Sequence, residues 1–196
     1  MAWNTTRADG EVLTATIWNE LTSAVSLRST TINKTVTLYA GNSMIATSTY
    51  ASLGQQLTTE NNVNFIYGEY SSVAGDRMQW GVQFDPGWNS SNLYATFNWT
   101  AKTTEAGTVV WSLSGYRLGD NSTMNTALAA VITSTDTFLG SSTCYAFHRS
   151  AETTEFVVTG SGNYITFDLQ RKTTGTLSTS ARLLNVELRG SYASTY

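Results

Sequence analysis

Apolar and polar residues alternate along most of the chain from residue 34 onward. Apolar side chains recur at every second position in about eight segments, which are separated by stretches rich in Gly, Asn, Asp and Ser. The alternating apolar positions are Val36 and Leu38; Val63, Phe65 and Tyr67; Trp80, Val82 and Phe84; Leu93, Ala95, Phe97 and Trp99; Val109, Trp111 and Leu113; 156–158; Ile165, Phe167 and Leu169; and Leu184, Val186 and Leu188. A period of two predicts strands that each bury one face. Regularly spaced strands without helices between them predict an all-β, antiparallel sandwich, and about eight strands are typical of a jelly roll.

Two stretches interrupt this alternation. Residues 42–60 are polar and weakly patterned, and they predict a long surface connection. Residues 120–132 carry scattered apolar positions, which fit either a short helix or an extended loop that crosses between the sheets.

The N-terminal part of the chain has a different period. Apolar residues recur at helical spacing from Ile17 to Leu27, and Thr14 is available as an N-cap, so the pattern predicts a helix over residues 14–27. A helix of about 13 residues is marginal alone in water. We therefore expect it to pack against its own domain, its copies in an oligomer or another protein, and we divide the chain into an anchoring arm at residues 1–33 and a sandwich domain at residues 34–196.

The segment before this helix has too little apolar content to fold on its own. Five large apolar side chains of the arm and helix could form one stripe, and these are Trp3, Val12, Leu13, Ile17 and Leu21. A Trp on such an arm either tucks loosely onto its own domain or anchors in the pocket of a partner. We interpret the stripe as the means by which the chain attaches to a larger particle.

Charged residues make up only 13% of the chain, and the net charge is −3. Without a basic stripe among the aromatic residues, binding to nucleic acid through phosphates is not expected. No apolar run reaches the ~20 residues that span a bilayer, so we expect no membrane insertion. Residues 1–20 lack the basic-then-apolar order of a signal peptide, so we expect synthesis in the cytoplasm. The low charge favours packing against other protein, and we predict a homotrimer.

The sequence shows no constellation that favours catalysis. His148 is the one His and has no carboxylate nearer than Glu152, so we interpret it as a surface residue. Cys144, the one Cys, is interpreted as a small core residue. Acidic pairs such as Glu69 with Asp76 or Glu152 with Glu155 are no more than fourteen acids permit by chance. We expect no enzymatic activity, no cofactor and no metal site.

Aromatic residues are abundant, at 12% of the chain, and they are the side chains most suited to a binding role here. Trp80, Trp99 and Trp111 share the apolar phase of their strands, so we expect them in the core. Trp88 follows a Pro-Gly turn and Tyr94 falls on the opposite phase of its strand. These two residues are the candidates for surface binding, where a ring could stack on a sugar or fill a protein pocket.

The chain from about residue 35 to 190 resembles a group of jelly-roll proteins encoded by tailed bacteriophages near their structural genes. These proteins carry a Trp turn, a strand ending in an aromatic-Trp-Thr/Ser pattern and then a Val-Trp strand. The matching segments here are Pro86-Gly-Trp88, Phe97-Asn-Trp99-Thr100, Val110-Trp111, Gly119-Asp120, Asp136-Thr137, Phe167 and Ala181-Arg182-Leu183. The Trp turn is one residue shorter than the usual Pro-x-x-Trp of the group. The opening Gly10-Glu-Val-Leu-Thr-Ala15, followed by Trp18-Asn19, is similar to the start of many phage tail and baseplate-associated proteins.

The resemblance implies a structural role on the surface of a virion, with no catalytic residues to carry over. Such a protein would decorate the capsid or form a compact tail or baseplate appendage, and it could bind a glycan on the host surface. The alternative is a carbohydrate-binding module that acts alone through exposed aromatic rings. Glycan binding by an isolated monomer would favour the alternative, whereas an obligate trimer without sugar affinity would favour the virion role.

Overall fold

The computed structural model describes residues 31–44, 50–57, 63–72, 75–86, 88–124, 128, 130–140 and 145–193. The predicted helix over residues 14–27 lies outside the described residues. So do the five residues of the predicted anchoring stripe, which are Trp3, Val12, Leu13, Ile17 and Leu21.

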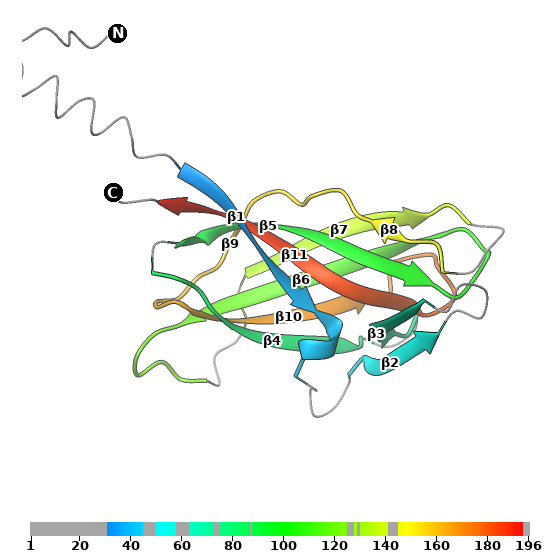
Figure 1. The fold of residues 1–196 in the computed structure, drawn as a ribbon, viewed down its shortest axis with the longest axis horizontal. Helices are drawn as coiled ribbons and strands as arrows, with labels where there is room; N and C mark the ends of the chain where they lie inside the picture. The colour runs from blue at the N-terminus through cyan, green and yellow to red at the C-terminus, as the bar shows by residue number, and fades with distance from the viewer. Residues whose placement is uncertain are drawn as a thin grey trace, which may run out of the picture.

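The described residues form two antiparallel sheets that face each other, as Figure 1 shows. Sheet A consists of β1 (Thr31–Tyr39), β2 (Ser52–Leu57), β3 (Asn64–Tyr70), β5 (Trp88–Ala101), β8 (His148–Arg149), β9 (Phe156–Val157) and β11 (Ala181–Ala193). Sheet B consists of β4 (Arg77–Gln83), β6 (Gly107–Leu118), β7 (Ala130–Phe138) and β10 (Tyr164–Lys172). A short 3-10 helix, η1 (Ala40–Asn42), follows β1.

The strand order is that of a jelly roll with one added hairpin. Sheet B runs β4-β10-β6-β7, while in sheet A β11 pairs with β1 and β5, and β5 pairs with both β8 and β9. Because β8 and β9 pair with successive parts of β5, they act as one interrupted strand. Eight strands then remain once the β2–β3 hairpin is set aside, in the two four-stranded layers of a jelly roll. The predicted fold class is confirmed, and the hairpin is an addition to it.

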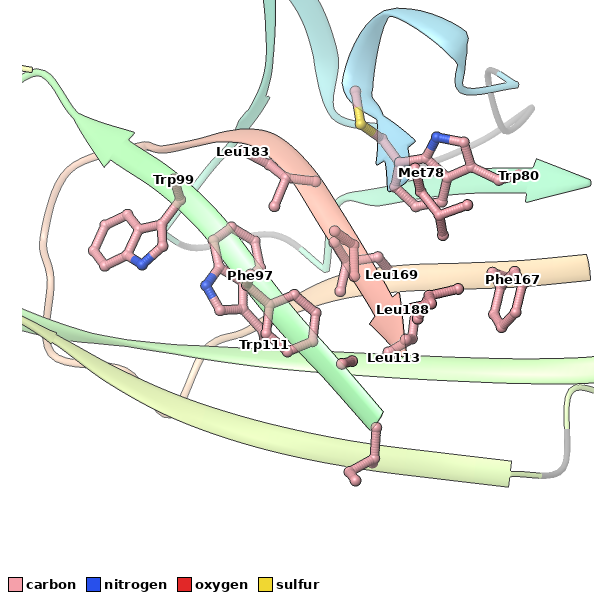
Figure 2. Close-up of a cluster of buried hydrophobic side chains, with 14 of the residues drawn as sticks. Met78, Trp80, Phe97, Trp99, Trp111, Leu113, Phe167, Leu169, Leu183 and Leu188 are labelled. Atoms are coloured by element: carbon pink, nitrogen blue, oxygen red, sulfur yellow. The ribbon is translucent and has the colours of Figure 1, made fainter. Parts of the chain in front are cut away.

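Three aromatic strand positions form the centre of the core, as Figure 2 shows. Trp99 and Trp111 are fully buried and Trp80 nearly so, as the alternating pattern predicted. The ring of Trp111 lies 5.2 Å from that of Tyr70 and 6.1 Å from that of Phe97, so it joins the two sheets. Each buried ring of this size removes a large apolar area from water and so stabilises the sandwich.

The predicted phase of β11 is wrong at Leu184. The pairing of β11 with β5 shifts register between Leu183 and Asn185. Such a bulge inserts one residue and turns the side chains before it to the opposite face. Leu183 is therefore fully buried in place of Leu184, while Val186 and Leu188 keep the predicted inward phase.

Both interruptions of the alternating pattern contain strands that the sequence did not predict. Residues 42–60, expected to be a surface connection, include β2. Residues 120–132, expected to be a short helix or loop, end in the first residues of β7. The predicted boundary at residue 34 is also late, because Thr31 already pairs with Ala193. Among the described residues there is no helix with the length and hydrophobicity that crossing a membrane requires.

Candidate functional site

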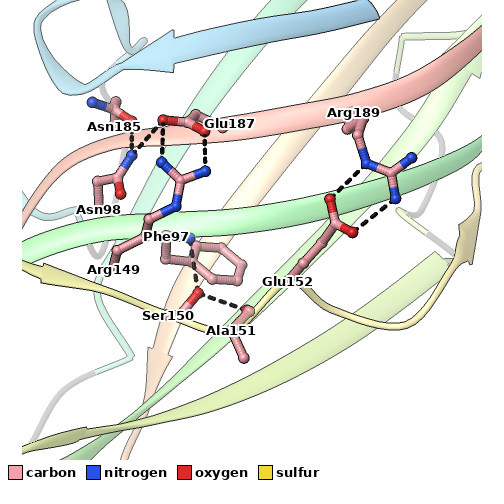
Figure 3. A network of polar contacts seen from close by, with 9 residues as sticks. All are labelled: Phe97, Asn98, Arg149, Ser150, Ala151, Glu152, Asn185, Glu187 and Arg189. Carbon is pink, nitrogen blue, oxygen red and sulfur yellow. Dashed lines mark hydrogen bonds and ion pairs between the residues drawn. The ribbon is translucent and has the colours of Figure 1, made fainter. Parts of the chain in front are cut away.

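The outer face of sheet A carries a polar network that joins β5, β8 and β11, as Figure 3 shows. The side-chain amide of Asn98 donates to Asn185 Oδ1 at 2.7 Å and to Glu187 Oε1 at 2.9 Å. Arg149 donates to both carboxylate oxygens of Glu187, at 3.2 and 2.7 Å. Two-point contacts of this kind fix the orientation of both side chains. The network therefore ties the interrupted strand β8 to the centre of the sheet.

A second ion pair on this face holds the candidate residue Tyr94. Arg189 donates to both oxygens of Glu152, at 2.7 Å each, and its guanidinium lies 4.3 Å from the centre of the Tyr94 ring. Hydrogen bonding from Arg189 lowers the pKa of Glu152 below its ordinary value. Tyr94 does lie on the outer face, as predicted, but it is half-buried and Arg189 covers one side of its ring. Arg189 thus leaves only part of the Tyr94 ring available for stacking on a ligand.

Trp88 is not exposed, and its prediction as a surface-binding residue is wrong. Its side chain is only 6% exposed, and its ring centre lies 4.7 Å from that of Phe84. A Cβ atom at Gly190 would lie 3.1 Å from the Trp88 ring, so the indole packs directly on the backbone of β11. The Pro-Gly turn places this ring inside the end of the sandwich.

Three of the acids in the pairs that the sequence permits by chance, Glu69, Asp76 and Glu152, contact other groups. Glu69 lies 3.6 Å from Arg182, and Asp76 accepts the backbone N–H of Ser71 at 2.6 Å. The guanidinium of Arg182 is buried and lies 4.3 Å from the centre of the Tyr67 ring, an arrangement that favours a cation over an aromatic face. Glu69 therefore links β3 to β11, and Asp76 fixes the connection between β3 and β4.

His148 is partly buried rather than free on the surface. Its ring lies 4.6 Å from Phe138 and 5.1 Å from Trp99, where it helps to close the side of the sandwich between β7 and β8. Cys144 lies outside the described residues. Within the described part of the chain, no three His, Cys, Asp or Glu side chains come together as metal ligands.

Two of the open concavities on the described surface are of similar size. One, of about 440 Å³, is at the end of sheet B and is lined in part by Gln83, Asp120, Asn163 and Tyr164. The Tyr164 ring lies over Gly81, where a Cβ atom would come within 1.8 Å of its hydroxyl, so only glycine admits it. A flat ring beside amide and carboxylate groups is chemically suited to a polar, ring-shaped ligand such as a sugar.

The other concavity, of about 450 Å³, lies between η1 and the β2–β3 hairpin. Its lining includes Tyr39, Gln55, Phe65, Ile66 and Leu184 and contains no charged side chain. This mixture of aromatic and aliphatic groups is chemically suited to contact with protein.

Comparison with known proteins gives likenesses of fold alone. No family model matches the chain, and no curated protein does. Among solved structures, dimeric latent PorU from Porphyromonas gingivalis is similar with a TM-score of 0.45 and 15% identity, over 85% of this chain and 13% of that chain. The CBM36-1 domain of a multidomain xylanase from the hindgut metagenome of Trinervitermes trinervoides is similar with a TM-score of 0.45 and 9% identity, over 83% of this chain and 100% of that chain. Arabinose-bound MgGH51 α-L-arabinofuranosidase is similar with a TM-score of 0.41 and 11% identity, over 82% of this chain and 25% of that chain.

Large exposed apolar side chains lie on and beside two edge elements of the sandwich, the β2–β3 hairpin and β7, and the sequence pattern did not predict them. We call the first set the hairpin side, and its members are Tyr39, Tyr50, Leu53, Leu57 and Ile66. We call the second set the β7 side, and its members are Val131, Leu139, Phe147 and Val157. Tyr50, Leu53, Leu57 and Val131 lie inside the two stretches where the alternating pattern is weak, whereas Tyr39, Ile66 and Val157 fall within predicted strands. No local signal separated the first four from ordinary loop residues.

Proposed function

We propose that this chain is a non-enzymatic structural protein on the surface of a tailed-phage virion, attached through its N-terminal segment. The observation that carries the proposal is the pairing of Thr31 with Ala193. This pairing places the start of β1 at the same end of the sandwich as the end of β11, visible at one end of Figure 1. The first 30 residues can then attach to a particle at that end, and the body of the sandwich projects away from it.

The chemistry of the outer face supports a structural role. Glu187 and Glu152 are each held by two contacts from an arginine, and both ion pairs connect strands of sheet A. The resemblance to phage jelly-roll proteins rests partly on Phe97, Trp99 and Trp111, which form the centre of the core. The residues that carry the resemblance thus stabilise the fold that would be displayed.

Deletion of residues 1–30 is expected to leave a folded sandwich that no longer joins particles. The cut falls before Thr31 because β1 already pairs with β11 from that residue. Contacts from several copies add up when copies are linked, so removal of the arm from every copy removes all of them.

We expect Trp3→Ala to lower the occupancy of particles by the chain at least ~10-fold, which corresponds to the loss of ~1.4 kcal/mol of docking energy. Occupancy is measured by quantitative immunoblotting of gradient-purified particles.

Lys102→Ala is the control for Trp3→Ala, because Lys102 is exposed in the turn after β5, at the end of the sandwich opposite Ala193. It should leave occupancy unchanged. If the truncated chain joined particles at wild-type occupancy, attachment would run through the sandwich itself and the proposed role of the arm would be wrong.

A second candidate function is carbohydrate binding by an isolated monomer. The concavity beside Tyr164 favours it, because an aromatic ring, an amide and a carboxylate meet there. Affinity electrophoresis in gels that contain soluble neutral polysaccharides discriminates the two. Retardation that Tyr164→Ala abolishes, shown by a monomer that does not join particles, would favour this candidate over the virion role.

A further inference from the structure

The outer face of sheet B differs in chemistry from the outer face of sheet A. On sheet A, the ion pairs of Glu187 and Glu152 with two arginines lie across the face. On sheet B, the side chains that alternate with the core residues of β4, β6 and β10 point outward. These outward residues are Gln79, Gly81 and Gln83; Ser112, Ser114 and Tyr116; and Tyr164, Thr166, Asp168 and Gln170. Amides, hydroxyls and phenol rings therefore make up most of this face.

Strand pairing brings these outward residues into rows across the sheet. Thr166 of β10 pairs with Gly81 of β4 on one side and with Tyr116 of β6 on the other. Asp168, two residues further along β10, pairs with Gln79 of β4. The three adjacent strands thus present one continuous face, with β10 along its middle.

The one carboxylate in the middle of this face is covered by amides. Asp168 is only 2% exposed, and it accepts hydrogen bonds from Gln79 at 3.3 Å and from Gln170 at 3.2 Å. The guanidinium of Arg77 lies 3.9 Å from the same carboxylate and balances its charge. The middle of the face therefore offers a ligand amide groups, which both donate and accept hydrogen bonds, in place of an exposed charge.

The concavity at the Tyr164 end of the face is lined by polar groups that are free to bind a ligand. Within the described part of the chain, the side chains of Asp120 and Asn163 and the hydroxyl of Tyr164 form no hydrogen bond. The Tyr164 ring lies over Gly81, where a Cβ atom would overlap its hydroxyl. A few free polar groups around a hollow, beside an aromatic ring of defined position, are typical of a ligand site.

We propose that the outer face of sheet B binds a neutral polysaccharide, which stacks one sugar ring on Tyr164 and extends along β10 toward Gln170. A sugar ring has an apolar face that packs on an aromatic ring, and its hydroxyls match amides because both groups donate and accept. Tyr164 and Gln170 are about 20 Å apart along the strand at ~3.3 Å per residue, which leaves room for several sugar rings. The free carboxylate of Asp120 repels an acidic polysaccharide, so the ligand is neutral.

Polysaccharide binding by this face does not depend on attachment to a particle, so it goes beyond the proposed function and specifies the ligand of the second candidate. Figure 1 shows that β4, β6 and β10 run along the length of the sandwich. A polysaccharide can therefore reach their outer face from the side when the N-terminal segment holds one end of the sandwich to a particle.

Affinity electrophoresis of the full chain in native gels tests the proposal. The gels contain soluble β-glucan, galactomannan or arabinoxylan, and polygalacturonate is the acidic counterpart. At least one neutral polysaccharide should retard the chain, whereas polygalacturonate should not. Tyr164→Ala should weaken the retarding interaction roughly 10-fold, because the stacking surface is lost.

Two further variants separate the position of the ring from its presence. Gly81→Ala keeps the tyrosine but displaces its ring, so it should also weaken binding. Tyr94→Ala is the matched control, because it removes a ring from the outer face of sheet A and should leave binding unchanged. Circular dichroism and thermal unfolding confirm that each variant is folded.

Titration calorimetry with oligosaccharides of increasing length, cut from the polysaccharide that binds, tests the path along β10. Affinity should keep rising as the ligand lengthens across the face. The proposal would be overturned by a chain that no neutral polysaccharide retards, by retardation in polygalacturonate alone, by a loss with Tyr94→Ala equal to that with Tyr164→Ala, or by an affinity that does not rise beyond a disaccharide. A chain that joined particles in any of these cases would leave the virion role standing without this ligand.

Discussion

Trp111→Ala is expected to lower the free energy of unfolding by ~3–5 kcal/mol, since truncation of a buried Trp removes its packing and leaves a cavity. The side chain is fully buried, and its ring lies between Tyr70 of sheet A and the strands of sheet B. Loss of this ring removes contacts across both layers. The measurement is equilibrium unfolding in urea, followed by Trp fluorescence and circular dichroism.

Two phenylalanine variants separate packing from hydrogen bonding. The indole nitrogen of Trp111 has no hydrogen-bond partner among the described residues, so Trp111→Phe should recover much of the loss. The indole nitrogen of Trp99 donates to Asp136 at 2.7 Å, so Trp99→Phe should cost ~1 kcal/mol more than Trp111→Phe. Wild-type stability of Trp111→Ala would mean that the inward phase of β6 is assigned wrongly.

Arg171→Ala is expected to lower the free energy of unfolding by at least ~3 kcal/mol, because each buried polar group left without a partner costs ~1–3 kcal/mol. Arg171 is 2% exposed and donates to the backbone carbonyls of Tyr70, Leu177 and Thr179. Burial lowers the pKa of its guanidinium. The side chain thus joins the end of β3 to the connection between β10 and β11.

Arg171→Lys is the informative companion, since an ammonium is a compact point charge that cannot reproduce the planar fork of a guanidinium. We expect it to recover less than half of the lost stability in the same urea titration. A loss below ~1 kcal/mol for Arg171→Ala would show that water replaces the guanidinium at these carbonyls, since satisfied carbonyls carry little penalty.

The sequence alone predicted the parts of the fold where one face of a strand is uniformly apolar. Leu93, Ala95, Phe97 and Trp99 on β5 are all fully buried, as their spacing required. Period two is a strong signal here because β5 is an inner strand of sheet A, between β11 and β8, and a slip of one residue would expose the whole set.

The prediction failed where burial depends on partners distant in sequence. The inward phase of β7 contains Ser134 and Asp136 beside Ile132, and Asp136 is accommodated only because Trp99 donates to it. β2 has little apolar phase at all and forms by pairing with β3. The burial of Trp88 depends on Gly190, a residue of another strand. Local pattern contains none of this information.

The candidate surfaces were harder to predict than the fold. Tyr94 was placed on the correct face, but the arginine that covers it comes from β11 through cross-strand pairing. The hairpin and β7 sides arise from topology, because they depend on which strands become outermost. A sequence pattern records which residues are apolar and not which edges stay open.

Electron microscopy of purified particles tests the proposed virion role most directly. Particles are labelled with antibody raised against residues 31–193, the part that carries the sandwich. The proposal predicts label at regular positions on the head or the tail, and loss of that label from particles assembled with the chain that lacks residues 1–30. Particles without label, with the chain recovered only as free protein that binds a neutral polysaccharide, would contradict it.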